Sequence, residues 1–137
     1  MPERAIDLNS DLGESYGAFQ IGADAELFSL ISSANVACGF HGGDPRTLDK
    51  TVKVASTRGV RVGAHPSYPD LVGFGRRVMA ATPDDIYADV LYQLGALDAF
   101  CRANGVAMQH VKAHGALNNV AANDEGVAGA IAAAVKA

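Results

Sequence analysis

The sequence has little of what marks the specialised classes of protein. Its 2 cysteines, Cys38 and Cys101, lie far apart and in no CxxC pairing, so a disulfide framework is not indicated and we expect reduced thiols. No apolar run approaches the roughly 18 residues that a membrane-spanning helix needs. Residues 1–4 lead directly into a strand-like run, without the apolar core and cleavage site of a signal peptide. We therefore expect a cytoplasmic protein with no membrane association.

Basic patches and nucleotide-binding motifs are also missing. The net charge is −4 and no basic stripe alternates with aromatic residues, which excludes nucleic acid as an expected partner. Neither a GxxxxGK motif followed by Ser or Thr nor a GxGxxG motif occurs in the chain. What the chain does have is an ordinary globular composition, with 49% hydrophobic and 19% charged residues. We expect residues 1–137 to form a single domain.

Glycine, proline and capping residues divide the chain into four repeated strand–helix units. Apolar runs predict strands over residues 5–9, 34–38, 60–64 and 108–112. Helices are predicted over residues 25–31, 45–58, 82–105 and from 124 onward, with N-caps at Asp24, Asp44, Thr82 and Asn123. Alternating short units imply an α/β fold with a parallel sheet, either a closed barrel or an open doubly wound sheet. The last helix runs to the end of the chain without a cap, which favours truncation relative to longer relatives.

Polar residues follow the first predicted strand, at the edge where parallel α/β folds bind their ligands. Asp7, Asn9 and Asp11 share one side at period-two spacing, and Glu14 comes shortly after them. Carboxylates so close together suit acid–base chemistry or cation binding, with turn formation and helix capping as the structural alternative. Function is favoured because Asp7 lies within the expected apolar strand, where an unpaired charge is costly.

A glycine-rich segment follows the second predicted strand, from Cys38 through His41, Gly42 and Gly43 to Asp44. The glycines allow the backbone to approach a ligand, and free N–H groups before a helix start favour an anion or oxyanion cradle. His41 is therefore a candidate catalytic or ligand-binding residue, and Asp44 is expected to be a cap. Cys38 is disfavoured as a nucleophile, because no sequence feature indicates a lowered thiol pKa.

The remaining candidates follow the third and fourth predicted strands. His65 opens the longest loop of the chain, and such loops often carry function. In that loop, the adjacent Arg76 and Arg77 form either a carboxylate-binding pair or a solvated turn. Period-two spacing places three more candidates on one face, where they could bind a metal or transfer protons: His110, Lys112 and His114.

Five stretches together resemble the LamB/YcsF family, in the family's own order. They are IDLNSDLGES, ANVACGFHGGDP, VGAHPSYPDLVGFGRR, YQLGALDAF and HVKAHGALNN. The resemblance implies a TIM-barrel-like (β/α) fold of the glycoside hydrolase/deacetylase type. This chain would form the amino-terminal part, about four βα units of it. Two positions depart from the family pattern: Ala113 stands where proline is usual, and Asn118 where tyrosine is usual.

The resemblance also implies an activity and partners. It suggests ATP-dependent opening of the lactam of 5-oxo-L-proline to L-glutamate, with ATP as co-substrate and subunits B and C of 5-oxoprolinase as partners. The missing P-loop is consistent with nucleotide handling that depends on those partners. We hypothesise that Asp11 or Glu14 activates water, that His65 and His114 transfer protons or hold the oxyanion, and that Lys112 neutralises charge. The expected substrate-binding residues are Asp7, Asn9, His41, Gly42, Arg76 and His110.

Two other interpretations stay open. The first is a metal-dependent hydrolase of the deacetylase type, in which Asp11, His41 and His65 hold a divalent ion that activates water. The second is a non-catalytic fragment with an open strand edge, or a partial barrel that a homo-oligomer completes by symmetry.

Overall fold

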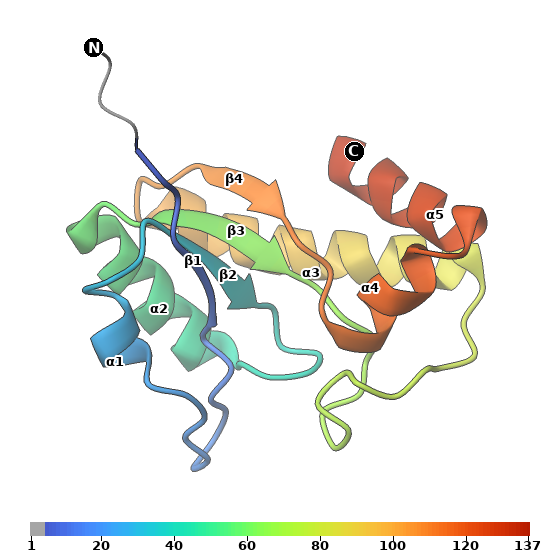
Figure 1. Cartoon of the computed structure of the whole chain (residues 1–137), viewed down its shortest axis with the longest axis horizontal. Helices are drawn as coiled ribbons and strands as arrows, with labels where there is room; N and C mark the ends of the chain where they lie inside the picture. Colours follow the sequence, from blue (N-terminus) through green and yellow to red (C-terminus); the bar gives the residue numbers. More distant parts are fainter. Residues whose placement is uncertain (1–4) are drawn as a thin grey trace.

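A computed structural model describes residues 5–137 and shows a parallel sheet backed by helices (Figure 1). The strands are β1 (Asn9–Leu12), β2 (Ser33–Ala37), β3 (Arg61–His65) and β4 (Met108–Val111), hydrogen-bonded in that order. The helices are α1 (Asp24–Leu27), α2 (Pro45–Arg58), α3 (Pro83–Ala103), α4 (Gly115–Ala121) and α5 (Glu125–Lys136). The α/β prediction with a parallel sheet is confirmed, and a TIM-barrel-like fold is consistent with this arrangement.

The hydrophobic core lies between the sheet and the helices α2 and α3, which cover one of its faces (Figure 1). Alternate strand residues, among them Val36 and Val62, point into this core and are fully buried. Val52 of α2 and Val90 of α3 meet them from the helix side with no exposed surface. Helix α5 packs on α3. Within residues 5–137, no helix is long and apolar enough to cross a membrane.

Two of the four predicted helix N-caps are confirmed and two are wrong. The side chains of Asp44 and Thr82 accept from the backbone N–H groups of Thr47 and Asp85, which confirms both as N-caps. The cap of α5 is Asp124 and not Asn123. Asp24 lies inside α1, and its carboxylate instead accepts from the backbone N–H of Gly13 at 2.9 Å.

Three elements differ clearly from the sequence prediction, and one of them is α1, which ends at Leu27 and not at residue 31. Strand β1 covers Asn9–Leu12 and not residues 5–9, because its partner β2 pairs with it only from Asn9 onward. Helix α4 directly after His114 was not predicted, since its Gly115 start lacks a capping side chain. The shift of β1 moves Asp11 into the strand and leaves Asp7 before it.

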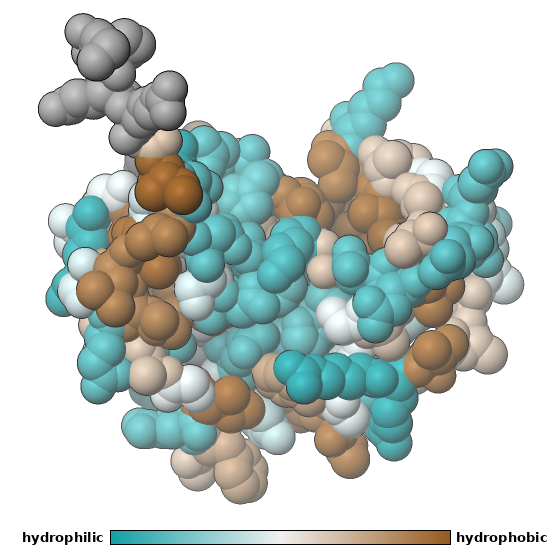
Figure 2. Space-filling model, in the orientation of Figure 1, coloured by the Kyte–Doolittle hydropathy of each residue, from teal (hydrophilic) through white to brown (hydrophobic). Residues whose placement is uncertain are grey.

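The face of the sheet opposite α2 and α3 is polar, as the hydrophilic centre of Figure 2 shows. Side chains on this face join neighbouring strands: Asn35 of β2 donates to Asp11 of β1 at 2.8 Å. His110 of β4 donates from Nε2 to the Asn35 side-chain oxygen at 2.7 Å. A row of hydrogen bonds therefore runs across the sheet beneath the strand ends.

Candidate active site

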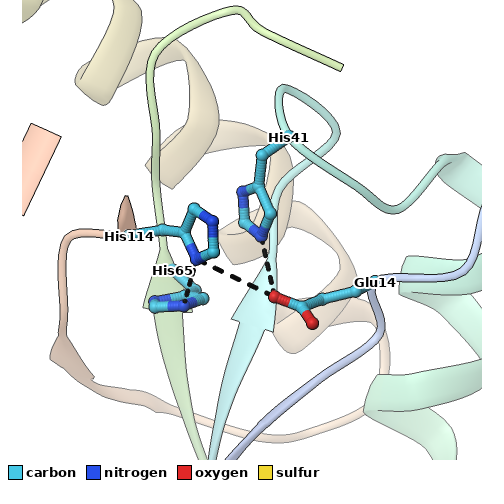
Figure 3. Close-up of side chains that lie close together, drawn as sticks. All are labelled: Glu14, His41, His65 and His114. Atoms are coloured by element: carbon cyan, nitrogen blue, oxygen red, sulfur yellow. Dashed lines mark hydrogen bonds and ion pairs between the residues drawn. The ribbon is translucent and has the colours of Figure 1, made fainter. Parts of the chain in front are cut away.

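Four side chains from four strand ends meet in one cluster (Figure 3). Glu14 follows β1, His41 follows β2, His65 is the last residue of β3 and His114 follows β4. One nitrogen or oxygen from each lies within 4.8 Å of the others. We call these residues the histidine cluster. The three imidazoles are buried and Glu14 is partly exposed, so the cluster opens on the Glu14 side.

One nitrogen of each imidazole donates its proton to an acceptor outside the cluster. His65 Nδ1 donates to the backbone carbonyl of Lys112 at 2.7 Å. His114 Nε2 donates to the backbone carbonyl of Phe74 at 2.7 Å. His41 Nδ1 lies 3.0 Å from the Ser67 hydroxyl, whose own proton is donated to a backbone carbonyl, so His41 is the donor here.

The other nitrogen of each ring therefore faces the inside of the cluster with a lone pair. His65 Nε2 and His114 Nδ1 lie 3.0 Å apart. His41 Nε2 lies 2.9 Å from Glu14 Oε1, and His114 Nδ1 lies 3.9 Å from the same oxygen. Burial lowers the pKa of His41, and burial together with the neighbouring His41 lowers the pKa of His114 to about 4. Imidazole nitrogens with lone pairs this close together could hold a metal ion.

The carboxylate in the histidine cluster is that of Glu14, whereas the sequence-based metal hypothesis named Asp11. Asp11 Oδ2 approaches His65 Nε2 only to 3.4 Å, while its other oxygen accepts from Lys112 Nζ at 2.9 Å. Glu14 and His114 take its place in the cluster. The neighbouring side chains of His65, Lys112 and Asn35 hold the pKa of Asp11 well below its usual range. Asp11 and Lys112 thus form an ion pair beside the cluster.

The loop after β3 shapes the cluster through a residue that the sequence pattern did not single out. Phe74 adopts a left-handed conformation (φ 55°), which is uncommon for a residue with a side chain. This turns its carbonyl to His114, and its ring packs edge-on against His41 and His114 at centroid distances of 5.2 and 5.1 Å. The glycines on either side, Gly73 and Gly75, are the signal that could have indicated an unusual turn.

The two arginines of this loop have separate contacts. Arg77 donates to the buried carboxylate of Asp70 and holds the pKa of Asp70 down to about 2. Arg76 lies over the Phe74 ring, 5.4 Å from its centroid. The pair therefore does not act as a unit, and Arg77 anchors the loop.

Several predicted substrate-binding residues lie away from the cluster. Asp7 lies before β1, half exposed, and pairs with Arg61 at 2.7 Å, so the premise of a costly unpaired charge was wrong. Arg61 begins β3, which places Asp7 at the amino-terminal end of the sheet. Asn9 and His110 belong to the hydrogen-bonded row around Asn35 in mid-sheet.

The glycine-rich segment after β2 serves packing more than anion binding. The N–H of Gly43 donates to the carbonyl of Glu14, and the N–H of Gly39 donates to that of Gly42. A Cβ on Gly42 would lie 2.7 Å from the Glu14 carbonyl oxygen, so glycine lets the Glu14 backbone approach His41. Cys38 is buried and free, and burial raises its thiol pKa to about 12, which agrees with its rejection as a nucleophile.

Known proteins share this fold and sequence. A model described as the LamB/YcsF family matches residues 6–137. The chain is 63% identical over 134 residues to the 5-oxoprolinase A subunit of Symbiobacterium thermophilum, covering 98% of this chain and 51% of that protein. It is 61% identical over 132 residues to the protein of the same name from Thermus thermophilus, covering 96% and 53%.

A solved structure gives the same result. The crystal structure of the lactam utilization protein from Thermus thermophilus has a TM-score of 0.95 and 59% identity, covering 97% of this chain and 54% of that one. The chain thus spans about half the length of the curated relatives it matches. Since the family model matches all but the first few residues, the chain belongs to the LamB/YcsF family.

Proposed function

We propose that this chain forms the amino-terminal half of the site that opens the lactam of 5-oxo-L-proline in an ATP-dependent 5-oxoprolinase. The observation that carries the proposal is the meeting of Glu14 and three histidines at four strand ends, with the ion pair of Asp11 and Lys112 beside them. Hydrolysis of an amide needs a positioned water, a base, a proton for the leaving nitrogen and a cation for the developing charge. We assign these tasks to the residues of this site.

Glu14 is the better general base of the two carboxylates. Asp11 is held ionised by Lys112, Asn35 and His65, which makes it a weak proton acceptor. The Glu14 side chain is partly exposed, and its Oε1 lies 2.9 Å from His41 Nε2. A water beside Glu14 could therefore lose its proton to the carboxylate.

The other groups follow from their positions. Lys112 is half exposed and would neutralise negative charge on the carbonyl oxygen of the substrate. The proton that the leaving nitrogen requires would come from Glu14, which has just accepted one from water, while His65 and His114 line the site with their N–H groups held by the carbonyls of Lys112 and Phe74. Arg76 lies above Phe74 and would bind the substrate carboxylate. Asp11 would accept a hydrogen bond from the lactam nitrogen.

ATP and partner subunits belong to the same proposal. The relatives are named as the A subunit of 5-oxoprolinase, which supports assembly with further subunits that we take to be B and C. ATP would phosphorylate the amide oxygen and so activate the carbonyl carbon for attack by water, with the nucleotide handled together with the partners. The ring C–N bond would then break as its nitrogen is protonated, and a second water would release phosphate from the acyl phosphate to give glutamate. The sequence lacks a P-loop, in keeping with this division. The remainder of the barrel would continue the sheet beside β4.

The test is an assay for glutamate and ADP. The purified chain is combined with subunits B and C, with and without the carboxy-terminal half of the A subunit of a relative as a separate chain. We expect glutamate to form from 5-oxo-L-proline only when ATP and the partners are present. If the chain is folded by circular dichroism and no combination releases glutamate, the proposal is wrong.

A further inference from the structure

The histidine cluster has more inward-facing acceptors than protons to satisfy them. In its uncharged form an imidazole has one N–H, and all three rings use theirs outward, on the Ser67 hydroxyl and on the carbonyls of Lys112 and Phe74. The lone pairs of His65 and His114 then lie 3.0 Å apart, and that of His41 lies 2.9 Å from a carboxylate oxygen of Glu14. Such a contact between acceptors is repulsive unless a proton or a cation lies between them.

The spacing of these atoms suits a metal ion. Ligands that bind a tetrahedral ion at about 2.0–2.1 Å lie about 3.3 Å from one another. His65 Nε2 and His114 Nδ1 are separated by 3.0 Å, and Glu14 Oε1 lies 2.9 and 3.9 Å from the nitrogens of His41 and His114. All four ligand atoms lie within 4.8 Å of one another, and the His41 and His114 rings stack in parallel with centroids 3.7 Å apart. Binding one ion through both rings therefore requires one of the two to turn out of the stack.

We propose that His41, His65 and His114 bind one transition-metal dication of the zinc type, through Nε2, Nε2 and Nδ1, with Glu14 beside the open coordination position. The binding itself would hold for any substrate, and its use in catalysis rests on the proposed function. There, a water on the ion would lie next to Glu14, which would accept its proton. This ligand set replaces Asp11 with His114 relative to the sequence-based hypothesis.

The nitrogen ligands determine which metal ions can bind at this site. Neutral imidazole nitrogens favour Zn²⁺, Co²⁺ and Ni²⁺, whereas Mg²⁺ and Ca²⁺ prefer oxygen ligands. Three neutral histidines bring no charge of their own, and Glu14 with nearby Asp11 supplies negative charge to balance the ion. Zinc should therefore bind tightly and magnesium should not compete.

The outer acceptors are already arranged as in a metal site. Ligand histidines usually donate their second N–H to a carboxylate, a carbonyl or a similar acceptor, which fixes the tautomer and the ring orientation. All three rings do so here, and two of the acceptors are backbone carbonyls that no side-chain substitution removes. Ser67 is the exception, since its hydroxyl is the acceptor for His41.

The experiment is a titration of the purified, tag-free chain, stripped with a chelator, by ZnCl₂ in a calorimeter. We expect one zinc ion per chain, with no heat from MgCl₂. His65→Gln and His114→Gln should each lower the affinity at least about 100-fold, because each removes one of three ligands. Ser67→Ala should lower it about 10-fold to 100-fold by freeing the His41 ring.

Two variants serve as controls. His110→Gln removes the remaining histidine of the chain, outside the cluster, and should leave the zinc affinity within about twofold. Glu14→Gln should keep the affinity within about tenfold, because the carboxylate is not one of the three nitrogen ligands. Equal loss in Glu14→Gln and His114→Gln would overturn this ligand set.

Other outcomes overturn the proposal outright. These are the absence of saturable zinc binding, wild-type affinity in the His65 and His114 variants, or competition by magnesium at equal concentration. Should the histidine variants fail to fold, the visible absorption of the Co²⁺-loaded wild-type chain decides, since nitrogen ligation in a four- or five-coordinate site gives intense bands. Glutamate release is not measured, so failure of the lactam proposal and failure of this one are distinguishable.

Discussion

The His110 ring of β4 crosses over β3 at Gly63 to reach Asn35 of β2. A Cβ on Gly63 would overlap the ring, so the absence of a side chain there is what allows the contact. The pairing of β3 with β4 shifts its register at this point, between Val62 and Gly63. The polar row across the sheet therefore depends on one glycine in the middle of a strand.

Gly63→Ala should lower the free energy of unfolding by about 1–3 kcal/mol, the range for forcing an extra methyl into a packed site. The His110 ring would have to leave Asn35, and the freed side-chain oxygen would lose a hydrogen bond. Urea unfolding followed by circular dichroism measures this change. Gly95→Ala is the matched control, since Gly95 lies in the exposed middle of α3 with nothing within 4 Å.

Gly95→Ala should instead raise the free energy of unfolding. Alanine stabilises a helix interior over glycine by about 0.5–1 kcal/mol. If both variants shift the unfolding midpoint alike, Gly63 has no special packing role.

Gly75→Ala should damage the histidine cluster. Gly75 has φ 65°, and a Cβ there would lie 2.8 Å from the His114 ring and 2.9 Å from the Cβ of His41. The loop carrying Phe74 would shift and release the ring of His114. We expect the zinc affinity and the reconstituted glutamate release to fall at least about tenfold, as for other changes outside the ligand shell.

Gly59→Ala separates crowding from backbone strain. Gly59 caps α2 at φ 67° and has nothing within 4 Å, so alanine there carries the same left-handed cost without touching the site. Gly59→Ala and Gly75→Ala should each lower the free energy of unfolding by about 1 kcal/mol or more. If Gly59→Ala lost as much zinc affinity as Gly75→Ala, backbone strain and not crowding would explain the loss in Gly75→Ala.

Much of the fold could be predicted from local signals. Asp44 followed by Pro45 and the Thr82 box with Asp85 fix two helix starts by hydrogen bonds between near neighbours. The limits of β1 could not be predicted this way, because they are set by pairing with Ser33 and the residues after it, far along the chain. Local apolar pattern therefore indicated the wrong residues for this strand.

The sequence predicted which strand ends carry the site residues, but not which of their side chains are in contact. The four strand ends follow from chain order, which is why Glu14, His41, His65 and His114 were all candidates. Which carboxylate would join the histidines was not accessible, since Asp11 is engaged by Lys112, which follows β4 and lies 101 residues away in sequence. The role of Phe74 depends on its unusual φ, which its residue type does not indicate.

Glu14→Gln should lower the reconstituted rate of glutamate release by about 10²–10⁴, the usual contribution of a general base. The amide keeps the size of the side chain, so folding should be retained, while it cannot accept a proton from water. Glu26→Gln is the matched control, because Glu26 is an exposed residue of α1 away from the cluster. Initial rates with saturating ATP measure the effect, and equal rates in the two variants would remove Glu14 from the mechanism.

Acid should weaken the loop that carries Phe74 through Asp70. The folded-state pKa of Asp70 is lowered to about 2 by Arg77, from an unfolded value of 3.8. A carboxyl with a lowered folded pKa stabilises the fold fully above its unfolded pKa, and this contribution is lost as the pH falls from about 4 to about 2. Asp70→Asn should therefore be less stable than wild type at pH 7, with the difference closing over that interval. Thermal unfolding at a series of pH values measures this, and a difference that stays constant from pH 7 to pH 2 would exclude the Asp70 carboxylate as its cause.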